Sequence, residues 1–215
     1  MSEIRAAIFD IGGVLTSSPV IAIREYALRQ GVDYGVLGPM IADHDLAWSR
    51  WERSEITIAQ FIEQFEDEGR SRGITVSAEG IMDAAFGTQS VREEMVAVVR
   101  HLRGKVRLGC ITNNVAREEV ESRPRAIILE DLFEVVIESS KVGLRKPDAR
   151  IYHMACEALD VTPPQSVFLD DIGANLKGAR ALGMATIKVN PDNGAIDELE
   201  SILGFLLPRG ASPAS

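Results

Sequence analysis

Three carboxylates directly follow short apolar runs of this chain. Asp10 follows the run 6–9, and Asp170 and Asp171 follow the run 166–169. Short continuous apolar runs are typical of strands buried on both faces of a parallel sheet, and ligands bind beyond the carboxyl ends of such strands. A carboxylate in that place bears a cost of desolvation unless it is paired or binds a metal. Because Mg²⁺ prefers carboxylate and carbonyl oxygens, the pattern predicts a magnesium site.

Two more segments supply groups that suit phosphoryl transfer. Thr112 and Asn113 follow an apolar run at 106–111, and Lys146 lies in a loop. An aspartate has a pKa of about 3.9 in a peptide, so Asp10 is ionised at neutral pH and is a candidate nucleophile that would form an aspartyl phosphate. We expect the Thr112 hydroxyl and the Asn113 backbone N–H to bind the phosphate. Lys146 would neutralise charge on the phosphate and on Asp10.

Each of these groups also has an ordinary structural interpretation. Paired aspartates after a strand commonly cap a helix, Thr-Asn is a common turn, and a lysine before proline is commonly a solvated loop charge. A common site is favoured because four separate segments each carry one such group, in this order. The histidines lie at no metal-ligand spacing, and Gly12-Gly13 lacks the third glycine of a dinucleotide fingerprint.

The elements that must position these groups alternate between strand and helix. Strands are predicted at 6–9, 106–111, 133–137, 166–169 and 185–189, and helices at 91–102, 149–159, 172–182 and 194–203, with a helix or loop at 115–129. This alternation predicts an α/β fold, a doubly wound parallel sheet with right-handed crossovers.

The chain between the first two strands has a different pattern. Helices are predicted at 20–30, 40–53, 57–69 and 77–86, with a break at 35–39. We therefore expect residues 17–88 to form an inserted all-helical cap on a core made of residues 1–16 and 89–207, followed by a disordered tail at 208–215. Trp48 and Trp51 share one helix face, which indicates a cap core or, as a weaker alternative, contact with a partly apolar leaving group.

Composition narrows the classes of function. The chain has 215 residues, a net charge of −9 and a pI of about 4.9, which argues against a nucleic-acid partner. Cys110 and Cys156 lie in predicted core elements and are expected to be reduced. No apolar run approaches the roughly 20 residues of a membrane-spanning helix. The expected protein is soluble, cytoplasmic, not membrane-bound, and a monomer or homodimer.

Four motifs resemble those of the haloacid dehalogenase (HAD) superfamily and extend over nearly the whole chain. They are the segments 6–15 (AAIFDIGGVL), 111–114 (ITNN), 146–148 (KPD) and 168–177 (FLDDIGANLK). The resemblance implies a Rossmann-like core with a C1-type helical cap. It also implies Mg²⁺-dependent hydrolysis of a small phosphorylated metabolite.

The resemblance assigns roles to individual residues. Asp10 would be both the nucleophile and a direct ligand of Mg²⁺. Gly12 would offer its backbone carbonyl to the metal, and Asp171 would be the second side-chain ligand. Asp170 would hold a metal-bound water, and Asn175 would support that network. Thr112, Asn113 and Lys146 keep the phosphate-binding roles given above.

Position 12 departs from the pattern of the family's phosphatases, which usually carry there a second aspartate as general acid and base. General acid–base catalysis contributes roughly 10²–10⁴-fold, and Gly12 cannot supply it. A good leaving group, such as that of an acyl or sugar 1-phosphate, would need little protonation. Alternatively, a metal-bound water or a cap residue such as Glu52, Arg53 or Glu55 would supply the proton.

Two other functions stay open at this point. The protein would be a catalytically weak or inactive binding protein if nothing replaces the missing acid. It would be a metal-independent 2-haloacid dehalogenase if Asp10 attacks carbon, because those enzymes also lack the second aspartate. The Asp170-Asp171 pair argues against the dehalogenase, since a metal-independent enzyme has no use for it.

Overall fold

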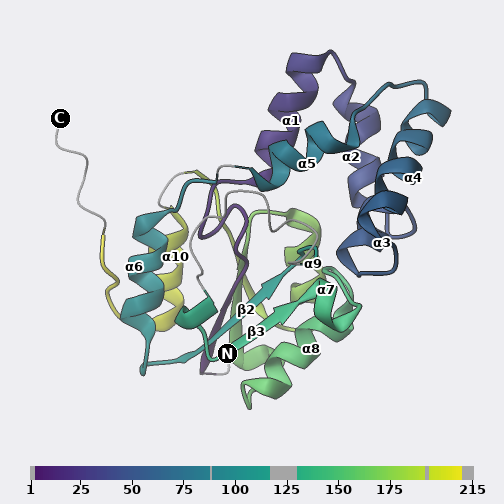
Figure 1. Cartoon of the computed structure of the whole chain (residues 1–215). Helices are drawn as coiled ribbons and strands as arrows, with labels where there is room; N and C mark the ends of the chain where they lie inside the picture. Colours follow the sequence, from purple (N-terminus) through teal and green to yellow (C-terminus); the bar gives the residue numbers. More distant parts are fainter. Residues whose placement is uncertain (1–2, 88, 117–129, 192–193, 210–215) are drawn as a thin grey trace, which may run out of the picture.

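The fold is built on one central sheet of five parallel strands. The computed structural model describes residues 3–87, 89–116, 130–191 and 194–209 (Figure 1). In spatial order the strands are β3 (Val135–Glu138), β2 (Arg107–Thr112), β1 (Ala6–Phe9), β4 (Ser166–Asp170) and β5 (Ala185–Lys188). Each neighbouring pair is parallel. The predicted doubly wound α/β fold is confirmed.

The register of the strands brings the predicted site residues to one edge of the sheet. Phe9 of β1 lies opposite Cys110 of β2 and Leu169 of β4. The next residue, Asp10, donates its backbone N–H to the Leu169 carbonyl at 2.9 Å. The backbone hydrogen bonding between β1 and β4 therefore continues as far as Asp10. Asp10 therefore leaves the central strand at the same level at which β2 and β4 end.

Helices cover both faces of the sheet because the strand side chains alternate between them. Phe9 faces α6 (Glu93–Leu102) and α10 (Gly194–Leu203), with which it shares one buried cluster. Ile8 faces the opposite side and shares a second cluster with α8 (Ala149–Ala158) and α9 (Gly173–Ala181). Fully burying a side chain of this size contributes about 1.5–3 kcal/mol. Figure 1 shows the two helix pairs on either side of the strands.

Five helices between β1 and α6 form a separate layer, which we call the helical insertion. They are α1 (Pro19–Gln30), α2 (Tyr34–Ala42), α3 (Ala47–Glu52), α4 (Ile58–Ser71) and α5 (Ala78–Phe86), at the upper right of Figure 1. The insertion has its own buried cluster, in which the Trp51 and Phe61 rings stack with centroids 4.2 Å apart. Trp48 and Trp51 are almost fully buried there, which confirms the interpretation that they build this core.

The insertion leaves and rejoins the core at one place. Thr16 and Val91 form an isolated antiparallel bridge. On either side of it, Ser17 donates its backbone N–H to the Ser90 carbonyl and Arg92 donates its own to the Leu15 carbonyl, both at 2.8 Å. The two connecting segments thus run side by side.

Two predictions for the insertion are wrong. Residues 35–39 do not form the predicted break between two helices, because helix α2 continues through Pro39. Gly38 has no Cβ to clash with the proline ring, and burial of Leu37 and Met40 offsets the hydrogen bond that Pro39 cannot make. The predicted single helix at 40–53 is instead two helices with a turn between them.

Outside the insertion, predicted and observed elements agree to within one or two residues, with three additions among the described residues. The four-residue helix α7 (Ser139–Val142) was not predicted, and 3₁₀ turns occur at Glu130–Leu132 and Pro163–Gln165. Most of the predicted helix or loop at 115–129 and most of the tail at 208–215 lie outside the described residues. Cys110 and Cys156 are both buried in the core. Among the described residues, no helix is long and apolar enough to cross a membrane.

Candidate active site

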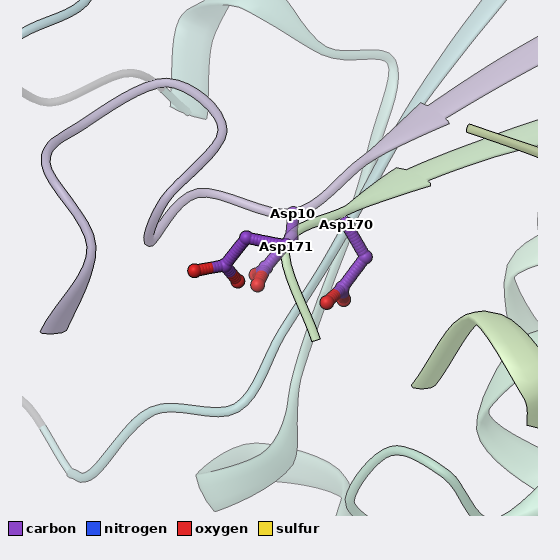
Figure 2. Close-up of side chains that lie close together, drawn as sticks. All are labelled: Asp10, Asp170 and Asp171. Atoms are coloured by element: carbon purple, nitrogen blue, oxygen red, sulfur yellow. The ribbon is translucent and has the colours of Figure 1, made fainter. Parts of the chain in front are cut away.

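Three carboxylates meet at the carboxyl ends of β1 and β4. Oxygens of Asp10, Asp170 and Asp171 all lie within 4.8 Å of one another (Figure 2). Asp10 and Asp170 are buried, and Asp171 is half-buried. They meet because adjacent parallel strands end at the same level, and each strand is followed at once by an acidic residue. The predicted acidic cluster is present.

Lys146 is the cation that joins these carboxylates. Its side chain is fully buried, and its Nζ lies 2.9 Å from Asp10 Oδ1 and 2.8 Å from Asp170 Oδ2. Nζ also donates to the Ile111 carbonyl at 2.8 Å, so three acceptors surround its three N–H groups. Burial opposes the charge on Lys146, but the two carboxylates outweigh it and raise the pKa of the lysine above its usual value. Lys146 is therefore a fixed positive charge beside Asp10.

The site carries more negative than positive charge. Burial raises the pKa of Asp10 to about 7, with Lys146 opposing the shift and Asp170 adding to it. Burial also raises the pKa of Asp171, although a hydrogen bond from Ser18 opposes that shift. Three carboxylates thus share one ammonium group in a poorly solvated place. A divalent cation would relieve this crowding, and a donor set of carboxylate oxygens fits Mg²⁺.

Asp170 is held from several directions. Its Oδ1 accepts from the Ile172 backbone N–H at 2.7 Å, and its Oδ2 accepts from Lys146. The Asn175 amide nitrogen donates to Asp170 as well, at 3.0 Å from Oδ2. In turn, the Tyr152 hydroxyl donates to the Asn175 carbonyl at 2.8 Å. Asp170 is therefore a fixed counter-ion for Lys146.

Two neighbouring residues, Ser18 and Gly13, position the Asp171 carboxylate, and neither was predicted as a site residue. Ser18 donates its hydroxyl to Asp171 Oδ2 at 2.6 Å, which ties the first residue before α1 to the acidic cluster. Gly13 has φ +77°, and a Cβ at that position would lie 2.1 Å from the same oxygen. Only glycine allows both this backbone conformation and this close approach.

The polar end of β2 holds the loop that carries Lys146. Thr112 is nearly buried at the end of the strand. The Asn113 side-chain carbonyl accepts from the Lys146 backbone N–H at 2.8 Å, and its amide donates to the Lys146 carbonyl at 3.1 Å. The next amide, Asn114, accepts from the Ser140 hydroxyl at 2.9 Å. Sequence reasoning assigned only a backbone N–H to Asn113 and missed this clamp on Lys146.

The helical insertion contacts the same loop from its other side. Arg145 Nε lies 2.8 Å from Glu52 Oε2 of α3, and both side chains are about nine-tenths buried. The two groups are paired by charge, although the N–H of Nε does not point at the carboxylate. Ser54 donates to the Ser140 carbonyl at 2.9 Å. Neither contact was predicted, because both depend on how the insertion folds back on the core.

The three insertion residues considered as replacement acids are already engaged in ion pairs. Glu52 pairs with Arg145 and accepts from Trp48 Nε1 at 2.9 Å. Arg53 donates twice to Glu55, at 2.6 and 2.9 Å, and this hydrogen bonding lowers the pKa of Glu55. An acid with a lowered pKa is a poor proton donor at neutral pH. The geometry thus does not favour these residues as replacements for the missing aspartate.

The arrangement of Asp10, Lys146 and the acidic pair agrees with a match to a family model. The model, described as a haloacid dehalogenase-like hydrolase, covers residues 4–183. The chain belongs to this family. The resemblance that the sequence motifs indicated is thereby confirmed.

Curated relatives of this HAD family member include parts of larger proteins. Mouse acyl-CoA dehydrogenase family member 10 is 34% identical over 212 residues, which are 96% of this chain and 20% of that protein. Pig bifunctional epoxide hydrolase 2 is 34% identical over 95% of this chain and 40% of its own length. The chain thus spans less than half of either relative. Phosphatase MT3486 of Mycobacterium tuberculosis is 28% identical over 98% of this chain and its own whole length.

A solved structure supports the fold of this HAD family member. A HAD family enzyme of Bacteroides thetaiotaomicron, in complex with magnesium and inorganic phosphate, superposes with a TM-score of 0.60 at 22% identity. The match covers 88% of this chain and 97% of that one. At this level of identity the similarity concerns the fold.

Proposed function

We propose that this protein is a Mg²⁺-dependent phosphatase that hydrolyses a small phosphorylated metabolite through an aspartyl phosphate on Asp10. The observation that carries the proposal is the placement of the Lys146 ammonium between Asp10 and Asp170, with Asp171 completing the acidic cluster. A lysine fixed beside a candidate nucleophile is arranged to stabilise the charge of a transferring phosphoryl group. A relative named as a phosphatase matches this chain over its whole length, which supports the same reaction.

In the first step an Asp10 carboxylate oxygen forms a bond to phosphorus, and the bond from phosphorus to the leaving oxygen breaks. Lys146 stays within reach of Asp10 throughout and neutralises charge on the phosphoryl group. The Thr112 hydroxyl and the Asn113 backbone N–H bind the phosphate oxygens. Water then attacks phosphorus in the second step, which releases phosphate and restores the Asp10 carboxylate.

The residues that would hold Mg²⁺ are Asp10, the Gly12 carbonyl and Asp171. When bound, the ion offsets the repulsion between the carboxylates and a phosphate dianion. Asp170 and Asn175 keep Lys146 and the adjoining backbone in position. Residues 17–88 serve as a cap that closes over the site and excludes water.

Phosphate release, measured with Mg²⁺ and with EDTA, tests this proposal. The substrates form a ladder of leaving groups: acyl phosphate, aryl phosphate, sugar 1-phosphate and simple alkyl phosphate. We expect turnover that requires Mg²⁺ and is lost in Asp10→Asn, which keeps the size of the side chain but not its nucleophilic charge. Unchanged turnover in that variant would exclude Asp10 as the nucleophile.

The same assay separates the two alternatives. A protein that binds Mg²⁺ but turns over no substrate on the ladder is a binding protein. Halide release from 2-chloropropionate in EDTA identifies a haloacid dehalogenase, because that reaction needs no metal.

A further inference from the structure

The space beside Gly12 is closed by a ring. A Cβ built on Gly12 would lie 3.0 Å from both Cγ and Cδ of Pro19, the first residue of α1. This is closer than carbon atoms pack at their optimal separation of about 3.5–4.0 Å. A side chain at position 12 would therefore require the Pro19 ring to move by a few tenths of an ångström.

Pro19 cannot easily move away from Gly12. Its ring is rigid, and it follows Ser18, whose hydroxyl donates to Asp171 at 2.6 Å. The Ser17 backbone N–H is bonded to the Ser90 carbonyl, which fixes the chain one residue earlier. Displacing the ring would shift the start of α1 and pull on the acidic cluster. The first turn of the insertion is thus packed against the loop in which an acid at position 12 would have to work.

We infer that the Pro19 ring occupies the space in which a general acid at position 12 would act, so that Gly12 and Pro19 together confine the enzyme to substrates whose leaving group departs without a proton. This inference rests on the proposed phosphatase function and names its substrate class. The bond from Asp10 to phosphorus forms, the bond to the leaving oxygen breaks, and the leaving group keeps the electron pair as an anion.

The chemistry of the leaving group selects an acyl phosphate as the best member of this class. A departing carboxylate has a conjugate acid with a pKa of about 4, so it is stable as an anion at neutral pH. A departing alkoxide resembles hydroxide, whose conjugate acid, water, is a very weak acid, so it needs a proton from the enzyme. Lys146 is not placed to supply that proton, because its Nζ is already held by Asp10, Asp170 and the Ile111 carbonyl.

A set of variants tests how the inference bears on the leaving group of the substrate. The proteins are the wild type, Gly12→Asp, and Gly12→Asp with Pro19→Ala, each assayed on acetyl phosphate and ethyl phosphate with Mg²⁺. In the wild type, kcat/KM should fall steeply from acetyl to ethyl phosphate. The double variant should raise kcat/KM on ethyl phosphate at least about tenfold, the lower part of the range for an added general acid. Gly12→Asp alone should lose activity on both substrates.

A matched control excludes a general effect of removing a proline. Pro39 is another proline of the insertion and lies in α2. Gly12→Asp with Pro39→Ala should behave like Gly12→Asp alone. An equal gain from Gly12→Asp without any change at Pro19, or no gain in the folded double variant, would overturn the inference.

A second measurement tests the packing without using activity. Gly12→Ala should lower the unfolding temperature when Pro19 is present and lower it less in Pro19→Ala, because alanine lacks both contacting ring carbons. Equal losses in the two backgrounds would show that Pro19 does not close position 12. A wild type that releases no phosphate from any substrate would contradict the proposed function, while this stability cycle would still decide whether Pro19 occupies the space.

Discussion

Asp10→Asn should make the metal-free protein more stable above neutral pH while abolishing turnover. Burial raises the pKa of Asp10 to about 7 from its ordinary value of 3.8. Between these values the folded protein holds a proton that the unfolded chain releases, so unfolding becomes easier as the pH rises. The decrease in the free energy of unfolding is complete above about pH 7. Asparagine does not titrate, so the variant does not lose this stability as the pH rises.

The size of this effect follows from the same two pKa values. They differ by about 3, and each pKa unit corresponds to about 1.4 kcal/mol, which gives a gain of up to about 4 kcal/mol at about pH 8. The attraction of Lys146 is already part of the Asp10 pKa, and Lys146 keeps Asp170 as its counter-ion in the variant. For a chain of this length, such a gain raises the unfolding temperature by roughly 8–16 °C.

Thermal unfolding in EDTA, followed by circular dichroism from about pH 4 to about pH 8, measures this gain. The two proteins should unfold at similar temperatures near pH 4 and separate as the pH rises. Parallel curves at all pH values would refute the argument that burial of the Asp10 charge is costly. Asp148→Asn is the matched control, because a hydrogen bond from Arg150 lowers the pKa of Asp148 and that variant should lose stability above about pH 4.

Two further substitutions test contacts around the site. Gly13→Ala should weaken Mg²⁺ binding at least about tenfold by titration calorimetry, because the new methyl group displaces the Asp171 carboxylate and alanine is strained at φ +77° by about 1–2 kcal/mol. Unchanged affinity would exclude Asp171 as a ligand. Arg145→Met should cost about 3–5 kcal/mol of unfolding free energy in urea, because it leaves the buried Glu52 carboxylate without its partner. Arg150→Met, at an exposed position, should change that free energy little.

The sequence predicted the centre of the sheet and the acidic cluster because both depend on local patterns. A buried parallel strand has the sequence pattern of a short apolar run, and the first polar residue after the run marks its end. Asp10, directly after β1, and Asp170, the last residue of β4, are such ends, and parallel pairing brings them to one level without further information. Lys146 was predicted from its motif, and it contacts both carboxylates.

What could not be predicted depends on contacts between distant segments. The Asn113 clamp on the Lys146 backbone joins residues 33 positions apart, and nothing in either segment specifies the partner. The pairing of Arg145 with Glu52 requires the folded insertion. The Pro19 ring next to Gly12 was likewise not foreseen. A proline after a hydroxyl-rich loop indicates where a helix begins but not what its ring touches.

The bridge between Thr16 and Val91 joins the two ends of the insertion. The insertion is therefore one closed loop that leaves and rejoins the core at a single place. The ends of that loop are already held together by two backbone hydrogen bonds. Closing a flexible loop costs only about 0.6 kcal/mol more for each doubling of its length. The length of the insertion therefore adds little to the cost of closing this loop. The insertion can thus vary in length while the strand that ends before Asp10 stays in place.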